Sequence, residues 1–451
     1  MICLDLQPYS LVQDTGFKRL MNHLAPNYSI PNRTHFSTKV VPLLYETVKA
    51  KVKFELDNAK YVSLTTDGWT CQHNIKSFYS LTARFVTDTF ELVHVILQVK
   101  YFPESHTAIN IGKFINESLQ SWDISPKKVS VIVTDNAANM LSAIKETQLT
   151  DGQHLSCVIH TMQLCIENKL FKEQRATSDA IAVFRSIAGH FHHSSTAVAK
   201  LQEIQKQLTL PQHTIIQDVG TRWNSTYYML ERFCEQKEAI VLYIMSRQER
   251  SKGNLKTPSQ QQWQLAEMLV CILKQFERAT NDLSSNNACI SQIIPFIYSM
   301  EKYLNFAGET ATGIKTVVEE LKNEFSRRFS MYKENVHLKI AMILDPRFKL
   351  KFVDENNASV MKETLMLEYF KFVNSSSENN DDKDGNSSST SSTSPSPIHS
   401  DSDDSPARKR KLMSVDIYSF FHDGILEDKE KERNVQRKGK SKRTKSLKDK
   451  W

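Results

Sequence analysis

The chain has 451 residues, 40 % of them hydrophobic, which is enough for a substantial core and two to four domains. It has no apolar stretch of membrane-spanning length, its first residues lack the pattern of a secretory signal, and its seven scattered cysteines favour a reducing compartment over a disulfide framework. The net charge of +7 is concentrated at one end, because residues 406–451 carry 15 Lys/Arg against 7 Asp/Glu, a surplus of +8, and the remainder sums to −1.

The first predicted region, residues 1–56, is helical. The stretch TGFKRLMNHL places Phe17, Leu20 and Leu24 at helical intervals, and VVPLLYETVKAKVKFEL follows after a turn. We therefore expect helices, broken by turns, before the first strand.

Strand patterns dominate the second region, residues 57–171. The short connection TDTF suits a hairpin between the second and third strands. In chain order we expect strands at 61–67, 77–86, 91–102, 129–134 and 154–160, with helices at 106–122 and 136–147 and another helix beginning near Thr161. The resulting order, β-β-β-α-β-α-β, matches the ribonuclease-H-like sheet.

The rest of the chain changes character twice. Residues 172–373 show helical patterns and no persistent strand, which predicts an all-α region of domain size. Residues 374–405 are rich in Ser, Asn, Asp and Pro and have too little apolar surface to offset the entropy of ordering, so we expect a disordered linker. A basic tail with a short aromatic helix is predicted for residues 406–451.

Two aspartates end predicted strands of this sheet. Asp67 closes the first strand, and Asp135 follows the apolar run VSVIVT. Carboxylates at the carboxyl ends of neighbouring strands can hold divalent metals against a phosphate. A plainer reading is that Asp135, before NAAN, caps a helix.

Four motifs together resemble the hAT-superfamily transposases, and most closely the zinc finger BED domain-containing proteins derived from them. These are TTDGWT (65–70), TDNAANM (134–140), CVIHTMQLCIENKL (157–170) and TRWNST (221–226). The resemblance implies a fold of α/β plus all-α type, in which an incomplete ribonuclease-H-like sheet is interrupted by a large helical insertion domain. It also implies a DDE metal triad that cuts and joins DNA.

The resemblance assigns roles position by position. Asp67 and Asp135 match the first two triad carboxylates, and Cys157 and His160 match a C-x-x-H pair near the DNA. Arg222 and Trp223 match an Arg-Trp pair whose Trp stacks on an extruded base, a role that an indole face suits. Trp223 could instead be an ordinary core aromatic. Cys157, His160 and Cys165 lie close in sequence, but no second ligand pair of finger spacing follows, so we expect no zinc finger.

A third acidic residue is not identified. Glutamates inside the helical insertion and in the charged tail are poor replacements; they are Glu277, Glu301, Glu427, Glu430 and Glu432. We therefore expect a vestigial pair that binds Mg²⁺ or Mn²⁺ weakly at most, and no enzyme activity. The pattern of a BED finger and the family's apolar dimerisation segment are likewise not found, which suggests a truncated chain.

The basic tail carries a candidate nuclear address. PARKRK sets Arg408, Lys409, Arg410 and Lys411 in succession after a proline, and a second cluster, RKGKSKRTKSLK, spans 437–448. A nuclear import receptor is the expected partner of the first cluster, and DNA phosphates are an alternative partner of the second.

Three functions follow from these features. The favoured hypothesis is a domesticated, catalytically inactive nuclear protein in DNA binding or transcriptional regulation, with weak and salt-sensitive DNA contacts. The alternatives are an active metal-dependent DDE transposase or nuclease, and a protein-interaction module built on the helical insertion. High salt would separate the last, since it weakens phosphate contacts and spares apolar ones.

Overall fold

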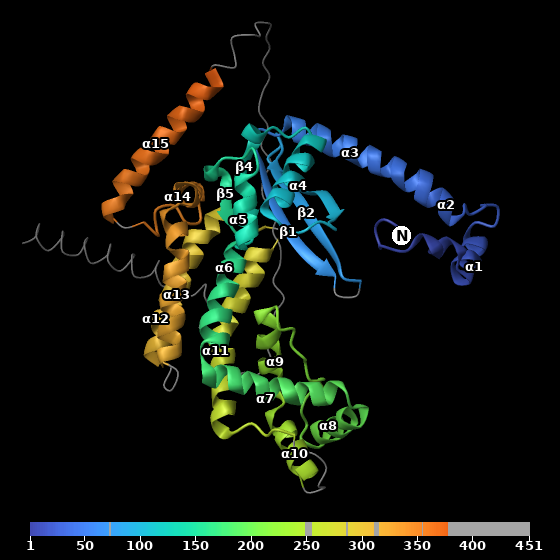
Figure 1. The fold of residues 1–451 in the computed structure, drawn as a ribbon, viewed down its shortest axis with the longest axis vertical. Helices are drawn as coiled ribbons and strands as arrows, with labels where there is room; N and C mark the ends of the chain where they lie inside the picture. Colours follow the sequence, from blue (N-terminus) through green and yellow to red (C-terminus); the bar gives the residue numbers. More distant parts are fainter. Residues whose placement is uncertain (72–73, 249–254, 286, 311–314, 354, 378–451) are drawn as a thin grey trace, which may run out of the picture. The chain divides into compact units, whose positions relative to one another are not determined.

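The computed structural model describes residues 1–377 except 72–73, 249–254, 286, 311–314 and 354 (Figure 1). The chain divides into two compact units, Met1–His160 and Thr161–Trp451. No helix in the described ranges has the length and apolar character needed to cross a membrane. The predicted basic tail, with Arg408–Lys411 and the aromatic stretch at 412–428, lies outside the described residues.

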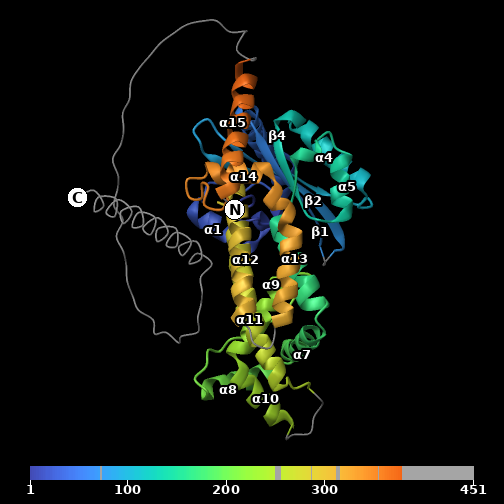
Figure 2. The same cartoon turned by 90° about the vertical axis from the view of Figure 1, so that its left-hand side faces the viewer.

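The first unit contains one five-stranded sheet in the order β3-β2-β1-β4-β5. The first three strands are antiparallel, and β4 and β5 run parallel to β1. Two helices, α4 and α5, precede and follow β4, which confirms the predicted order β-β-β-α-β-α-β (Figures 1 and 2). The elements are β1 (Val62–Cys71), β2 (Lys76–Val86), β3 (Leu92–Tyr101), α4 (Ala108–Ser121), β4 (Val129–Thr134), α5 (Ala138–Lys145) and β5 (His154–Ser156).

Side chains that point alternately to the two faces of the sheet form the core of this unit. Leu64 and Leu81 are fully buried on one face of the sheet, where α4 contributes Phe114 and Ile115. The helix begins at a Thr107 cap, whose side chain accepts from the backbone N–H of Asn110. The apolar stripe of α4 and the even-spaced strand residues therefore form one cluster.

Helices precede the sheet, as predicted for residues 1–56. They are α1 (Thr15–Leu24), α2 (Arg33–His35) and α3 (Val41–Asn58), with a 3₁₀ turn at Tyr9–Gln13 and a π-helical turn at Phe36–Val40. The end of α3 joins the sheet core through buried Leu56 and Ala59. Lys128 fixes this junction, since its ammonium donates to the backbone carbonyls of Leu56 and Asp57.

Every element that the structure describes in the second unit is helical. Aromatic side chains from α7, α9 and α11 pack together, with the ring centroid of Phe184 5.0 Å from those of Phe233 and Trp263. A second cluster joins α12 to α13, where Phe325 stacks on Phe329 at 4.2 Å. After α6 (Val158–Cys165) and a π-helical segment (Ile166–Lys172), the helices are α7 (Arg175–His192), α8 (Ser195–Gln207), α9 (Trp223–Glu235), α10 (Lys237–Gln248), α11 (Gln260–Ser284), α12 (Ile293–Thr310), α13 (Lys315–Glu334), α14 (Val336–Leu344) and α15 (Glu355–Ser377).

Two predicted boundaries were wrong. The fifth strand ends at Ser156 rather than at residue 160, because its partner β4 ends at Thr134 and offers nothing further to pair with. The backbone N–H of Cys157 closes the pairing on the Thr134 carbonyl at 2.7 Å, and a helix starts at once. At the other end, α15 continues to Ser377, so the first residues of the predicted linker at 374–405 are helical.

The division between the units also differs from the predicted one. It falls between His160 and Thr161, inside α6, whereas we placed the end of the sheet region at residue 171. The predicted N-terminal helical region, 1–56, belongs to the same unit as the sheet.

Candidate functional site

Asp67 lies on β1, and Asp135 is the first residue after the neighbouring parallel strand β4. Thr65 of β1 pairs with Val133 of β4, and each aspartate comes two residues later in the sequence. Side chains two residues apart share a face, and neighbouring strands are about 4.8 Å apart, so both carboxylates are on the face opposite buried Leu64. The structure thus brings together the two residues that the resemblance paired.

The electrostatics of Asp67 reflect this arrangement. Burial raises the pKa of its carboxyl group, and the nearby Asp135 carboxylate raises it further. The backbone N–H of Gly68 and the His160 side chain act in the opposite direction. Placing two like charges beside one another favours a proton or a cation at this position.

Asp135 is not the N-cap of α5, which is Ala137, but its side chain orders the turn before that helix. Its Oδ1 accepts a hydrogen bond from the backbone N–H of Ala137 at 3.0 Å, immediately before α5 begins at Ala138. Thr134, the residue before it, is buried and its hydroxyl lies 3.0 Å from Nε2 of His154 on β5. These bonds orient the chain as it leaves the sheet and hold Asp135 at the edge.

Cys157 immediately precedes α6 and His160 lies in its first turn, and both are near enough to the carboxylates to interact with them electrostatically. Burial raises the pKa of the Cys157 thiol, and Asp67 and Asp135 add to the effect, whereas the backbone N–H groups of His160 and Ile159 lower it. The thiol form is therefore favoured over the thiolate that a metal or a nucleophilic reaction requires. Nowhere in the described ranges do three or more His, Cys, Asp or Glu side chains form a group that could hold a metal ion.

Tyr79 packs in the core on the Leu64 face of the sheet, and its electrostatic coupling to the two aspartates was not predicted from the sequence. It lies directly across from Gly68 in the β1–β2 pair, and a Cβ at Gly68 would come within 2.7 Å of its ring carbons. Burial raises the pKa of the Tyr79 phenol, with further contributions from Asp135 and Asp67. The glycine in TTDGWT is thus the signal, because it makes room for the Tyr79 ring on the core face of the strand that carries Asp67.

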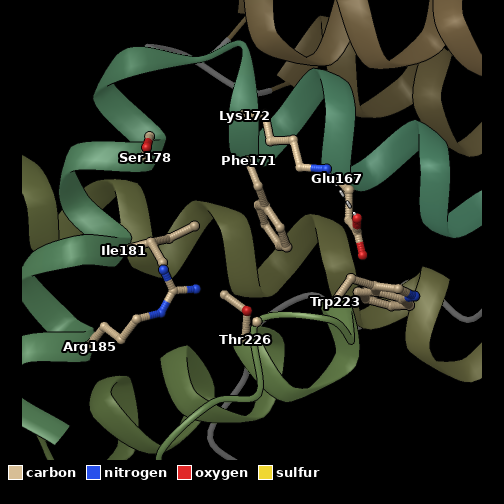
Figure 3. A pocket seen from close by; sticks show the side chains of 9 residues that line it. Glu167, Phe171, Lys172, Ser178, Ile181, Arg185, Trp223 and Thr226 are labelled. Atoms are coloured by element: carbon tan, nitrogen blue, oxygen red, sulfur yellow. Dashed lines mark hydrogen bonds and ion pairs between the residues drawn. The ribbon is translucent and has the colours of Figure 1, made fainter. Parts of the chain in front are cut away.

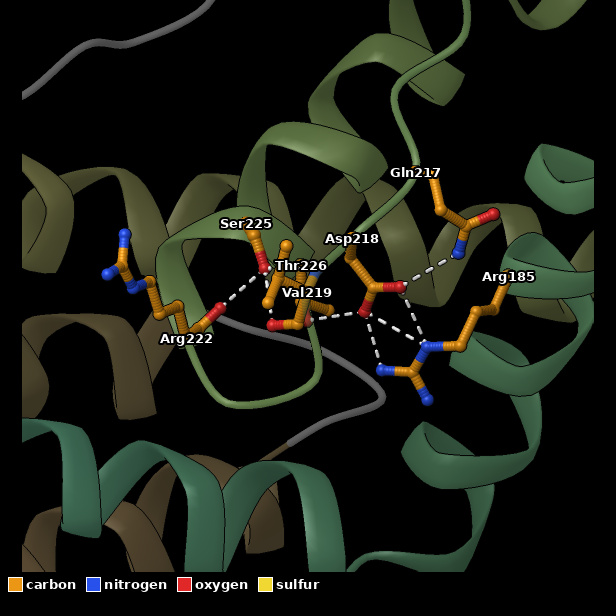
Figure 4. Close-up of polar contacts among 7 residues, drawn as sticks. All are labelled: Arg185, Gln217, Asp218, Val219, Arg222, Ser225 and Thr226. Carbon is orange, nitrogen blue, oxygen red and sulfur yellow. Dashed lines mark hydrogen bonds and ion pairs between the residues drawn. The ribbon is translucent and has the colours of Figure 1, made fainter. Parts of the chain in front are cut away.

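Arg222 and Trp223 lie in the second unit, at the end of a loop that a buried carboxylate anchors. Asp218 accepts hydrogen bonds from Arg185 Nε on α7 at 2.8 Å and from Thr226 Oγ1 on α9 at 2.9 Å (Figure 4). The Arg222 side chain is exposed and points away from this network. The loop therefore has a fixed conformation at the start of α9.

Trp223 is the first residue of α9 and only 2 % exposed. Its indole lines a cavity of about 360 Å³ together with Phe171, Ile181, Arg185 and Glu167 (Figure 3). In this structure Trp223 packs as a core aromatic, so its indole is not a freely exposed stacking surface.

Comparison with known proteins identifies the family. Residues 65–159 match the model of the ZBED1 RNase-like domain, residues 155–272 the ZBED1 RNase-like helical domain, and residues 294–378 the hAT-like transposase, RNase-H fold. The chain belongs to the hAT transposase-like family. Within it the chain is similar to the zinc finger BED domain-containing proteins, which confirms the resemblance noted in the motifs and makes it a transposase-derived protein.

Individual relatives give the extent of the similarity. Human zinc finger BED domain-containing protein 4 is 32 % identical over 393 residues, which cover 84 % of this chain and 32 % of that protein. Human zinc finger BED domain-containing protein 6 is 29 % identical, with 84 % and 40 % covered, and the putative AC transposase of Zea mays is 24 % identical, with 77 % and 44 % covered. The chain thus spans about a third to under half of the length of these relatives.

Proposed function

We propose that this hAT-like protein is a domesticated nuclear protein that binds DNA without cutting it and acts in transcriptional regulation. The observation that carries the proposal is the alignment of Asp67 with Asp135, next to His160, at the edge where the family binds a phosphate. The resemblance assigns a metal site to this pair, and in the described ranges the pair belongs to no group of three or more His, Cys, Asp or Glu side chains that could hold a metal ion.

The ligands fit a divalent cation in kind but not in number. Carboxylate oxygens suit Mg²⁺ and Mn²⁺, whereas a clamp of two metals needs more anionic ligands than one pair. A cation bound here would supply positive charge between the aspartates and a phosphate. Without it, the like charges of Asp67 and Asp135 repel the DNA backbone. We therefore expect Mg²⁺ to strengthen DNA binding modestly, and we derive no cleavage step.

Phosphate contacts should come chiefly from the basic clusters. Residues 1–405 have a net charge of −1, whereas 406–451 carry +8. Fluorescence anisotropy of a labelled duplex, measured with the 451-residue chain from 50 to 200 mM salt, should show log affinity falling linearly with log salt. Replacing Lys and Arg in 437–448 by Gln should make that slope shallower by about 0.9 for each lost contact. Absence of duplex binding at low salt would contradict the proposal.

Nuclear entry is proposed to depend on the cluster at 408–411. A fluorescent fusion of the chain should concentrate in the nucleus, and replacing Arg408, Lys409, Arg410 and Lys411 by Ala should release it to the cytosol. Neutralising the cluster at 437–448 is the matched control, because it tests whether any loss of positive charge reduces nuclear accumulation. Nuclear retention after the first change and loss after the second would reverse the assignment.

The aligned carboxylates also favour a second candidate function, metal-dependent cleavage of DNA. It requires a further acidic ligand for the Asp67–Asp135 pair. Nicking of duplex DNA that depends on the metal and on both aspartates would support it over the first proposal.

A further inference from the structure

Three aromatic side chains form a row across the antiparallel part of the sheet. Trp69 of β1 pairs with Phe78 of β2, and Phe78 pairs with Tyr101 of β3. The ring centroids of Trp69 and Phe78 are 5.6 Å apart with planes 21° from parallel, and those of Phe78 and Tyr101 are 5.8 Å apart. We call Trp69, Phe78 and Tyr101 the aromatic ladder.

The aromatic ladder is open to solvent on the face that carries the carboxylates. Trp69 follows Asp67 by two residues on β1, so both side chains lie on one side of the sheet. Trp69 is 43 % exposed and Tyr101 is 48 % exposed, whereas Trp122, in the same unit, is 5 % exposed. Neighbouring large apolar side chains that stay exposed together are a feature of binding surfaces.

The end of β4 leaves one side of Trp69 without a neighbouring strand. The parallel pairing of β1 with β4 runs to Thr65 and Val133, and β4 ends at Thr134, whereas β1 continues to Cys71. Phe78 supports the indole from the β2 side. A further flat ring could therefore continue the stack from the β4 side, next to Asp67 and Asp135.

A lysine supplies a positive charge beside the aromatic ladder. Residues 68–82 contain one lysine and no Asp or Glu. That lysine, Lys76, holds its ammonium 5.4 Å from the centre of the Tyr101 ring. Aromatic rings beside a positive charge are the features on which bases of single-stranded nucleic acid stack.

We propose that the aromatic ladder is a stacking surface for an unpaired base of DNA, adjacent to the phosphate position at Asp67 and Asp135. The proposal rests on the proposed DNA binding and adds to it a preference for DNA with unpaired nucleotides. It also assigns base stacking to the exposed Trp69, since Trp223 is buried in its own unit.

Affinity for two DNA forms tests the proposal in the 451-residue chain. A blunt duplex and the same duplex with three unpaired thymidines at one 3′ end are compared by fluorescence anisotropy. Trp69→Ala should weaken binding to the overhang duplex by about 5- to 150-fold and leave the blunt duplex unchanged. Trp69→Phe should retain most of the affinity. Phe90→Ala is the matched control, because Phe90 is 91 % exposed in the β2–β3 turn at the opposite end of the strands.

A second readout does not depend on a variant that weakens binding. The Trp451→Phe substitution leaves four tryptophans. Of these Trp69 is exposed, whereas Trp122, Trp223 and Trp263 are at most 5 % exposed. Quenching of the Trp69 fluorescence by acrylamide should fall when the overhang duplex binds. In a separate experiment, 5-iododeoxyuridine in the overhang should crosslink to a residue of the aromatic ladder.

The outcomes separate the two proposals. Duplex binding without a preference for the overhang, or with equal losses for Trp69→Ala and Phe90→Ala, would overturn the stacking proposal alone. Failure to bind either DNA would overturn both. A self-associated chain that Trp69→Ala converts to monomers would show that a second copy covers the aromatic ladder, and would also overturn the proposal.

Discussion

The ion pair of Arg185 and Asp218 predicts that removing either partner lowers the stability by a different amount. The Asp218 side chain is 1 % exposed and that of Arg185 is 44 % exposed, so the two ends of the pair are unequally desolvated. Burial alone would raise the pKa of Asp218, but hydrogen bonds from Arg185 and Thr226 outweigh it and hold the pKa below its usual range. This contribution to stability is present above the unfolded pKa of about 3.9 and is lost as the pH falls through the folded value.

Removing Arg185 leaves the buried Asp218 carboxylate without its ion-pair partner, whereas neutralising Asp218 leaves the Arg185 guanidinium in contact with water. We expect Arg185→Ala to lower the free energy of unfolding of the helical unit by about 3 kcal/mol, the lower end for breaking a buried pair, because Thr226 still donates to Asp218. Asp218→Asn should cost about 1.5 kcal/mol, which is the value of a hydrogen bond to a charged group.

Urea unfolding at pH 7, followed by the fluorescence of buried Trp223 and Trp263, measures both losses. An Asp218→Asn loss equal to or larger than that of Arg185→Ala would refute the reasoning, because the guanidinium would then be the more desolvated partner. Repeating the comparison at pH 3 should reduce the difference between the parent and Asp218→Asn.

Three further predictions concern single side chains. Gly68→Ala should destabilise the first unit by about 1–3 kcal/mol, because its Cβ would lie 2.7 Å from the buried Tyr79 ring; an unchanged melting temperature would contradict this. Asp135→Asn keeps the oxygen that accepts from Ala137 but removes the negative charge beside Asp67, so the raised pKa of Asp67 should fall in a ¹³C titration. The free energy of unfolding at pH 7 should rise by up to about 1 kcal/mol. Because a raised folded pKa penalises the ionised form, this gain should vanish at acid pH, where Asp67 is protonated. Trp223→Ala should cost about 3–5 kcal/mol of unfolding free energy, because the side chain is 2 % exposed, and DNA binding lost without that cost would restore the predicted stacking role.

Local patterns were sufficient for the sheet and for the pairing of its two aspartates. The run from Val129 to Thr134 is apolar and β-branched and ends at a polar turn, so both its identity as a strand and its ends were readable. Once two strands were assigned to one parallel pair, the position of Asp67 next to Asp135 followed from the common edge at which such strands end.

Features that depend on distant partners were not readable. The length of β5 is set by the end of β4, and the row of Trp69, Phe78 and Tyr101 exists only in the observed strand register. The burial of Trp223 depends on the packing of α7 and α9, which its motif does not encode. Ser and Asn near residue 374 favour caps over helix interiors, yet α15 includes them up to Ser377.

The proposed function requires that the chain bind DNA without cutting it. The most direct test is nicking of supercoiled duplex DNA by the purified 451-residue chain with Mg²⁺ or Mn²⁺, with Asp135→Asn run alongside and folding checked by circular dichroism. We expect equal background nicking by both proteins, together with salt-sensitive binding. Metal-dependent nicking that Asp135→Asn abolishes would contradict the proposed function, and would mean that a further acidic residue completes the site.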